Sequence, residues 1–240
     1  MSKKIVVLTG AGISAESGIA TFRGAGGLWN NYPVSQVATP EGYHRNPELV
    51  LRFYNERRHE LQHVQPNGAH RILAEMERDY GGVTIITQNV DDLHERAGSR
   101  HVIHLHGELL KATSSRDPNN PACIRTLTPD ESDDLKVGDK AADGSQLRPF
   151  IVWFGEPVPR IEEAVAVTEQ ADVFIVVGTS LAVYPAAGLL QYVPAGVPVF
   201  LIDPEQVAVP AHRNVCFIRK GATEGMKKLR EMLKAQNILS

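Results

Sequence analysis

Continuous apolar runs recur along this chain, and segments with helical character separate several of them. The runs cover residues 5–8, 83–87, 102–105, 173–177 and 197–202. A short run without polar alternation predicts a strand buried on both faces, and such strands alternating with helices predict a parallel sheet. We therefore expect an α/β fold, with a Rossmann-like parallel sheet that carries helices on both faces.

Polar or glycine residues follow each apolar run. A buried polar group without a partner costs roughly 1–3 kcal/mol, so these residues either have partners in the fold or line a site. In open parallel sheets, ligands bind at the carboxyl ends of the strands, near a switch in strand order. The strand ends therefore predict one shared crevice, lined by Thr9-Gly10-Ala11-Gly12, Gln88-Asn89-Val90-Asp91, His106-Gly107, Gly178-Thr179-Ser180 and Asp203.

Two stretches, residues 21–66 and 113–149, do not follow the alternation of strands and helices. In the first, Asn46-Pro47-Glu48 is a favourable helix start, and we expect that helix to continue to Val64. The second is polar and too long for a structureless loop. We expect the two insertions to form a smaller lobe, and the larger part of the fold to comprise about residues 1–20, 67–112 and 150–240.

The composition is that of a soluble globular protein, with 240 residues, 42% hydrophobic and 22% charged, and a net charge of −3. It favours neither a nucleic-acid nor a membrane partner. Two cysteines argue against a disulfide framework. Lys3-Lys4 before an apolar run resembles a signal peptide, but the run breaks at Thr9-Gly10, so we interpret it as the first strand. We expect a cytoplasmic monomer.

The turn after the first strand has candidate chemistry. A glycine-rich strand-to-helix turn lets a backbone approach a pyrophosphate, and the following helix N-terminus attracts the anion. The turn reads Gly10-Ala11-Gly12, which does not match G-x-G-x-x-G. A tight turn that binds no ligand is therefore the alternative.

Six motifs in order resemble the sirtuins, a family of NAD-dependent protein deacylases. They are "GAGIS" (10–14), "GIATFR" (18–23), "TQNVD" (87–91), "HLHG" (104–107), "WFGE" (153–156) and "GTSLAVYPAA" (178–187). The resemblance spans nearly the whole chain and implies a single domain over 1–240. It implies removal of acyl groups from protein lysines, with NAD as co-substrate and nicotinamide and O-acyl-ADP-ribose as products.

The resemblance also implies roles for individual residues. The catalytic residues would be His106, Asn89 and Asp91. NAD would contact Gly10, Ala11, Gly12, Ser14, Glu16, Thr21, Phe22, Arg23, Trp29, Gln88, Asn89, Asp91, His106, Gly178, Thr179, Ser180, Asp203 and Ala222. The acylated peptide would lie along Val152, Phe154, Gly155 and Glu156, by strand addition.

Some of these roles have structural alternatives. Imidazole suits a general base, but a histidine is often structural. His104 and His106 alternate onto one strand face, and the motif assigns the base to His106 and leaves His104 structural. Asn89 and Asp91 could instead cap the next helix. Sirtuins usually have Asn where this chain has Asp203, although a carboxylate can also bind a ribose hydroxyl.

Tyr54 and Arg57 are three residues apart on the predicted helix and therefore share a face. Sirtuins that remove succinyl and malonyl groups carry Tyr and Arg at this spacing. Arg57 could bind the acyl carboxylate bidentately, with Tyr54 adding a hydroxyl. The alternative is a solvated helix with Tyr54 packed beneath it.

The chain departs from the family at the structural zinc, which sirtuins hold with two cysteine pairs between the "HG" and "FGE" motifs. That interval holds only Cys123 and no histidine, so four tetrahedral ligands are not available. We expect no structural zinc, and a lobe held by packing and hydrogen bonds.

Two other functions remain open from the sequence. One is a metal-dependent hydrolase that uses Asp91, Asp92, His94, His104 and His106, although this leaves the glycine-rich motifs unexplained. The other is a non-catalytic sensor of NAD or ADP-ribose.

Overall fold

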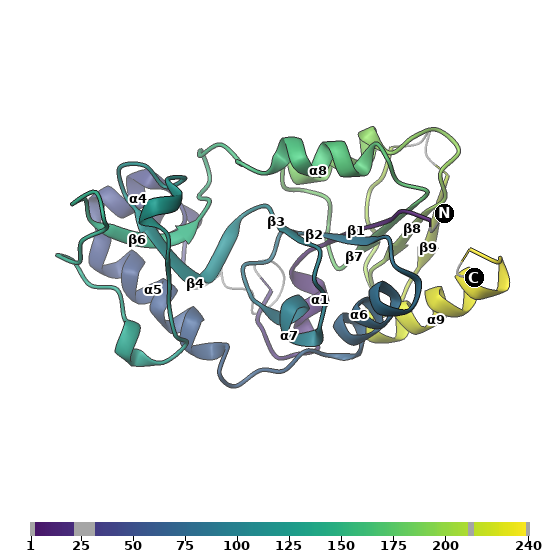
Figure 1. Cartoon of the computed structure of the whole chain (residues 1–240), viewed down its shortest axis with the longest axis horizontal. Helices are drawn as coiled ribbons and strands as arrows, with labels where there is room; N and C mark the ends of the chain where they lie inside the picture. The colour runs from purple at the N-terminus through teal and green to yellow at the C-terminus, as the bar shows by residue number, and fades with distance from the viewer. Residues whose placement is uncertain (1–2, 22–31, 211–213, 239–240) are drawn as a thin grey trace.

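The computed structural model describes residues 3–21, 32–210 and 214–238. Its larger part is built on a six-stranded parallel sheet with the strand order β3-β2-β1-β7-β8-β9. A smaller lobe lies at one end of the molecule (Figure 1). This architecture confirms the predicted α/β fold. The parallel strands are β1 (Ile5–Thr9), β2 (Val83–Thr87), β3 (Val102–His104), β7 (Val173–Val177), β8 (Val199–Ile202) and β9 (Val215–Ile218).

The central strands are those that the apolar runs predict. Every residue of β1, β7 and β8 is buried, because helices cover both faces of the sheet. The edge strand β9 was not predicted, although its four residues are apolar. It pairs with β8 on one side only, and its two middle residues, Cys216 and Phe217, are exposed.

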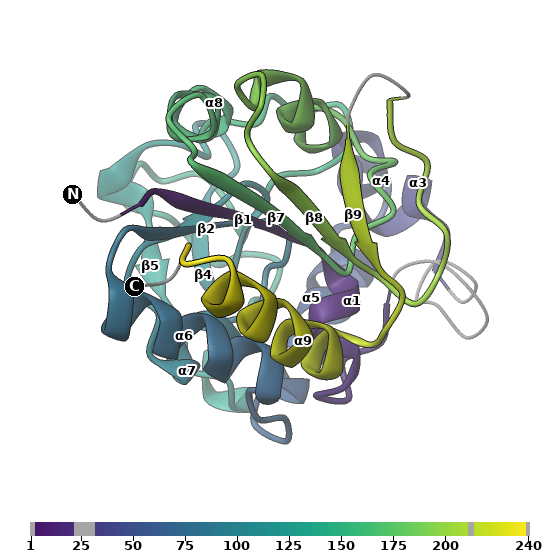
Figure 2. The same cartoon turned by 90° about the vertical axis from the view of Figure 1, so that its right-hand side faces the viewer.

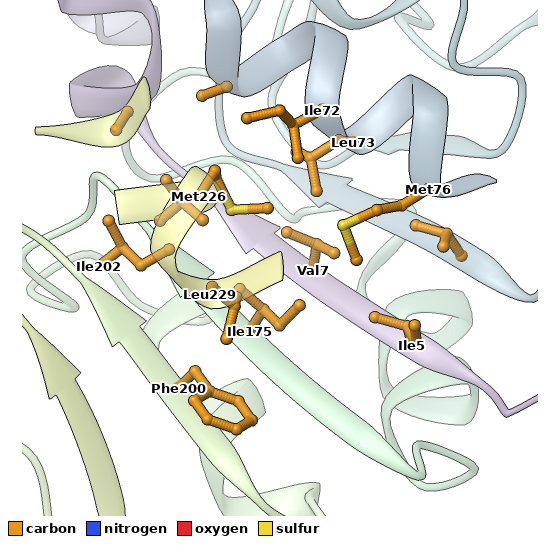
Figure 3. Packing of buried hydrophobic residues seen from close by; sticks show 14 of the residues in the cluster. Ile5, Val7, Ile72, Leu73, Met76, Ile175, Phe200, Ile202, Met226 and Leu229 are labelled. Atoms are coloured by element: carbon orange, nitrogen blue, oxygen red, sulfur yellow. The ribbon is translucent and has the colours of Figure 1, made fainter. Parts of the chain in front are cut away.

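Two layers of helices sandwich the sheet (Figure 2). One face carries α6 (Gly68–Tyr80) and α9 (Ala222–Ala235), and the other carries α8 (Ile161–Thr168) and the 3₁₀-helix η3 (Ala186–Tyr192). In Figure 3, Met76 of α6 and Leu229 of α9 point towards Val7 of β1 and Ile175 of β7. Both helices are amphipathic, so burying their apolar faces on the sheet fixes their positions.

The order in which strands are added to the sheet reverses between β1 and β7. From β1 the chain builds β2 and β3 on one side, and it then crosses to β7 and adds β8 and β9 on the other. Parallel pairing of β1 with both β2 and β7 brings Thr9, Thr87 and Val177 into one row. This row is the switch point at which ligands bind in folds of this type.

The smaller lobe combines helices with a three-stranded antiparallel sheet of order β5-β4-β6. Its strands are β4 (Gly107–Ser114), β5 (Arg125–Thr126) and β6 (Leu147–Ile151), and its helical segments are α3 (Val34–Val37), α4 (Pro40–Arg45), α5 (Pro47–Glu60), η1 (Pro121–Cys123) and η2 (Glu131–Asp133).

The start of α5 is confirmed, since the Asn46 side chain accepts a hydrogen bond from Leu49 N at 3.0 Å and Pro47 occupies the first turn. The predicted end at Val64 is wrong, because α5 ends at Glu60. Beyond that point the backbone bonds tighten to i→i−3. The Arg96 side chain then binds the carbonyl oxygens of Leu61 and Val64.

Polar contacts join the two insertions of the lobe. The Asn55 side chain bonds both the carbonyl and the amide of Leu135, at 3.0 and 3.1 Å. Within the second insertion, Ser114 donates to Asp143 and contacts Ser145, both within 2.8 Å. Cys123 is buried in the lobe's apolar core.

The described residues, 3–21, 32–210 and 214–238, contain no group of three or more His, Cys, Asp or Glu side chains arranged to hold a metal ion. None of their helices has the length and apolar character that crossing a lipid bilayer requires.

Candidate functional site

A cavity of about 650 Å³ lies at the switch point and reaches the smaller lobe. Its size is that of a small-molecule site. Every residue to which the sirtuin resemblance gave a catalytic, NAD-binding or substrate-binding role lines it, apart from Phe22, Arg23 and Trp29, which lie outside the described residues. Thr9 and Gly107, which were also expected in the crevice, do not line it. The lining set is Gly10, Ala11, Gly12, Ser14, Glu16, Thr21, Tyr54, Arg57, Gln88, Asn89, Asp91, His106, Val152, Phe154, Gly155, Glu156, Gly178, Thr179, Ser180, Asp203 and Ala222.

The glycine-rich turn before α1 (Ala11–Ala15) is locked onto the end of β7. Gly12 N donates to Gly178 O at 2.8 Å, and Gly10 N donates to Val177 O at 3.1 Å. A Cβ atom on Gly12 would lie 2.7 Å from the Cα atom of Gly178, and Gly178 has a φ of +63°. Only glycine permits this approach, which brings two backbone turns together along one wall of the cavity.

A hydrogen-bonded chain joins three predicted residues at the floor of the cavity. Asn89 Nδ2 donates to Ser14 Oγ at 3.1 Å, and Ser14 Oγ donates to Asp91 Oδ2 at 3.0 Å. All three side chains are buried. Burial raises the pKa of Asp91, although hydrogen bonds from Leu93 and Ser14 oppose the shift.

Asp91 bonds the first residue of the next helix, although the N-cap residue of that helix is Asp92. Asp91 Oδ1 accepts a hydrogen bond from Leu93 N at 3.1 Å, at the start of α7 (Leu93–Ala97). Asn89 is oriented by Ser14 instead of capping that helix. The Asn89 side-chain oxygen has no partner among the described residues and lies in the wall of the cavity.

A second buried network, which the sequence reading missed, lies beneath the floor. Thr9 Oγ1 donates to Thr87 Oγ1 at 2.9 Å and contacts His94 Nε2 at 3.1 Å. Thr87 Oγ1 also accepts from Asn89 N at 3.0 Å, so the network supports the Asn89 backbone. Burial holds the pKa of His94 well below its ordinary value, and the ring is therefore neutral. The only sequence signal was a threonine ending each of two neighbouring strands.

The two histidines near β3 have different surroundings. His104 is the last residue of β3, so the predicted alternation does not extend to His106. His104 lies 2.7 Å from Glu95 through Nε2 and does not line the cavity, as its structural assignment requires. His106 lines the cavity, and its Nδ1 contacts Gln88 O at 3.1 Å. A carbonyl only accepts, so Nδ1 carries the proton and Nε2 keeps a free lone pair in the neutral ring.

The chemistry of His106 follows from its burial, which lowers its pKa below the ordinary 6.5. The neutral ring, which can accept a proton, therefore dominates at neutral pH. The arrangement suits a general base that the backbone of Gln88 orients.

On the lobe side of the cavity, α5 contributes Tyr54 and Arg57. Arg57 Nη2 donates to Glu60 at 2.8 Å, but its Nε and Nη1 atoms are buried and have no partner among the described residues. The Tyr54 hydroxyl accepts a hydrogen bond from Trp153 Nε1 at 3.1 Å. Arg57 is thus neither fully solvated nor fully paired, and it can bind a further anion.

Part of the predicted peptide edge is engaged within the chain. Val152 N donates to His106 O and Phe154 N donates to Ala38 O, both at 2.9 Å. Arg148 holds the Glu156 carboxylate bidentately, at 2.6 and 3.0 Å. Glu156 therefore shapes the turn, and the amide groups of Val152 and Phe154 are not free to pair with a peptide.

The other end of the cavity has polar groups from four segments. Gln88 Nε2 donates to Thr179 Oγ1 at 3.0 Å. Asp203 Oδ1 accepts from Glu205 N, and burial raises the Asp203 pKa. Glu16 accepts from Thr223 N at the start of α9, beside Ala222.

The metal-hydrolase alternative predicted one cluster of five ligands. His94 instead bonds Thr9, His104 bonds Glu95, and Asp91 bonds Ser14 and Leu93. The described part of the chain does not assemble these residues into a ligand group.

The fold and the cavity define a Rossmann-like α/β protein with a nucleotide-type site at its topological switch point. The family model described as "Sir2 family" matches residues 10–185. The chain therefore belongs to the Sir2 family.

Individual relatives agree with this assignment. An NAD-dependent protein deacylase of Bacteroides thetaiotaomicron (strain ATCC 29148) is 62% identical over 231 residues, which are 96% of this chain and 98% of that protein. The structure of a Sir2 homologue with ADP-ribose has a TM-score of 0.86 at 41% identity and covers 100% of this chain and 95% of the other. A Sir2 homologue with NAD has a TM-score of 0.85 at 42% identity, covering 100% and 91%.

Proposed function

We propose that this protein removes acyl groups from protein lysines in an NAD-dependent reaction, and that succinyl and malonyl groups are among its substrates. The 62% identity to a bacterial NAD-dependent protein deacylase supports the reaction class. The observation that carries the proposal is the cavity itself. It brings the glycine turn, the Asn89–Ser14–Asp91 chain and His106 together with the lobe's Tyr54 and Arg57.

The residues present fit NAD. Two interlocked backbone turns, at Gly10–Gly12 and Gly178–Thr179, form a wall that could face a pyrophosphate. Asp203, at the end of β8, has a carboxylate of the kind that binds ribose hydroxyl groups. When bound, NAD supplies an activated bond between ribose and nicotinamide, and its ribose accepts the acyl group.

Within this reaction, His106 accepts a ribose hydroxyl proton at its Nε2 atom. The Gln88 carbonyl fixes the ring, and burial keeps it neutral. Ser14 holds the Asn89 amide group, whose oxygen is left to accept a hydrogen bond from the ligand. Asp91 anchors this chain at the start of α7 and fixes its position against the reacting ribose.

The acyl preference rests on Arg57. The Arg57 guanidinium is half-buried in the cavity wall, and Glu60 binds only its Nη2 atom. Its Nε and Nη1 atoms are buried without a partner among the described residues, which favours an anionic ligand that can accept from them. A succinyl or malonyl group ends in a carboxylate that can accept from both atoms, whereas an acetyl group ends in a methyl group.

Mass spectrometry tests the proposal directly. One peptide, acetylated or succinylated on the same lysine, is incubated with the protein with and without NAD. We expect acyl loss only with NAD, together with O-acyl-ADP-ribose and nicotinamide, and a large loss of rate in His106→Ala. NAD binding without nicotinamide release would instead support a sensor, and acyl loss without NAD would support a hydrolase. The cytoplasmic location, the monomeric state and the absence of nucleic-acid partners stay predictions.

A further inference from the structure

The wall of the cavity beside α5 contains a tryptophan to which the reaction assigns no role. Trp153 is 2% exposed and lines the cavity together with Tyr54. Its indole Nε1 donates to the Tyr54 hydroxyl oxygen at 3.1 Å, across 99 positions of sequence. In this hydrogen bond the indole is the donor and the Tyr54 oxygen is the acceptor.

The direction of that bond determines what Tyr54 can offer a ligand. Indole N–H only donates, so the Tyr54 oxygen must accept from it. The hydroxyl proton then has to be donated elsewhere, and no acceptor for it lies within hydrogen-bonding distance among the described residues. Burial raises the pKa of Tyr54, so the hydroxyl keeps its proton.

The indole itself is held in place from several sides. The Arg148 guanidinium carbon lies 3.4 Å from the ring centroid, and Arg148 is 3% exposed. Arg148 binds the Glu156 carboxylate with two nitrogens, and that carboxylate also accepts from Trp153 N at 2.8 Å. The Tyr43 ring packs against the indole with a centroid distance of 5.0 Å. The ring therefore has little freedom to turn its N–H group away from Tyr54.

We propose that Trp153 is a positioning residue for acyl selection, which keeps the Tyr54 hydroxyl as a hydrogen-bond donor towards the acyl group. This inference rests on the proposed function. An acyl group that ends in a carboxylate accepts the Tyr54 proton and the unpaired Arg57 N–H groups. An acyl group that ends in a methyl group leaves the Tyr54 proton buried without an acceptor, which is unfavourable.

The experiment compares kcat/KM for succinyl-lysine and acetyl-lysine peptides and uses their ratio as the readout. Trp153→Phe keeps an aromatic ring over Arg148 and removes the N–H donor. We expect the ratio to fall by about five- to tenfold, the value of one hydrogen bond. The change should appear in KM for the succinyl peptide and not in KM for NAD.

A double-mutant cycle separates positioning from general damage. In a Tyr54→Phe background, Trp153→Phe should shift the ratio by less than about twofold, because the bond to be lost is already absent. Tyr43→Phe is the matched control. It removes a hydroxyl beside the same indole, but that hydroxyl donates to Leu147 O and Tyr43 does not line the cavity. Its ratio should equal that of the wild type.

A second variant covers the case in which Trp153→Phe does not fold. Benzothienylalanine at position 153 keeps the bicyclic shape and replaces the N–H group by sulfur, and it should lower the ratio equally. If the succinyl-to-acetyl ratio is unchanged in both position-153 variants, the inference is overturned. It is also overturned if Trp153→Phe lowers the ratio as much in the Tyr54→Phe background as in the wild type. In both cases the acyl preference of the wild type still stands. A wild type that does not process succinyl-lysine with NAD overturns the acyl preference and this inference together.

Discussion

Asp134→Ala should destabilise the smaller lobe strongly, because it removes the ionic partner of a buried arginine. Arg58 is 1% exposed, and its Nη2 atom donates to Asp134 Oδ1 at 2.8 Å. Its Nη1 atom donates to Asn55 Oδ1 at 3.1 Å, and Asn55 in turn binds the backbone of Leu135. Burial lowers the pKa of Arg58, and Asp134 opposes that shift. The pair thus joins α5 to the second insertion.

The magnitude follows from the exposure of the two partners. Removing one member of a buried ion pair costs roughly 3–5 kcal/mol, because the remaining charge is left uncompensated. The Asp134 side chain is 25% exposed, so water screens part of the interaction. We expect a loss of about 2–3 kcal/mol in the free energy of unfolding, which corresponds to a fall of about 5–10 °C in Tm for a chain of this size.

Urea and thermal unfolding, followed by circular dichroism, measure this loss. Glu163→Ala is the control, since Glu163 pairs with Arg160 on the surface, where both side chains are more than 40% exposed. Its cost should stay below about 1 kcal/mol. Asp134 also contacts His59 Nε2 at 2.7 Å, so part of the loss belongs to that bond. Adding Arg58→Met to Asp134→Ala should recover another part of the loss, because the buried guanidinium without a partner is then removed. If Asp134→Ala costs no more than the control, the Arg58 pair does not hold the lobe together.

Three further predictions concern the site and the lobe. Arg57→Met should lower kcat/KM for succinyl-lysine by roughly 10- to 100-fold, as expected for charge-assisted hydrogen bonds, and an equal loss on acetyl-lysine in the same kinetic assay would contradict the acyl pocket. Burial lowers the pKa of His106, so kcat/KM should fall on the acidic side with a midpoint below pH 6.5, when the ring becomes protonated; a midpoint above 6.5 in the pH–rate profile would contradict this. Ser14→Ala should cost roughly 2–4 kcal/mol in urea unfolding, because Asn89 Nδ2 and Asp91 Oδ2 both lose a buried partner; a cost under 1 kcal/mol would contradict the chain described above.

The sequence predicted those features that depend on local pattern. Continuous apolar runs located the strands at the centre of the sheet, because burial on both faces removes polar alternation. The start of α5 was also predictable, since Asn46 and Pro47 act on the first turn of their own helix. β6 was not expected, because Pro149 lies in the middle of it and proline is rare in strands.

Features that depend on long-range pairing were beyond the sequence. The predicted site residues lie at one cavity because their motifs follow the ends of neighbouring parallel strands. The hydrogen-bond partners of these residues were not predictable. Ser14 and Asn89 are 75 positions apart, and their contact depends on the register between β1 and β2. The same holds for Thr9 and His94, which are 85 positions apart. Each pairing exists only after the sheet has formed.

Helix α5 connects the stability of the lobe to the chemistry of the cavity. Tyr54 and Arg57 are three residues apart and line the cavity, while Asn55 and Arg58, each one position further, bind the segment around Asp134 and Leu135. A step of one residue turns an α-helix by about 100°, so the two pairs occupy different faces. The interval between Gly107 and Phe154 has only one cysteine, so a four-cysteine zinc site is not available to hold the lobe. The contacts of Asn55 and Arg58 instead fix the position of α5. The face that we propose selects the acyl group is therefore held by hydrogen bonds and one buried ion pair, and loosening that pair should reduce acyl selectivity as well as stability.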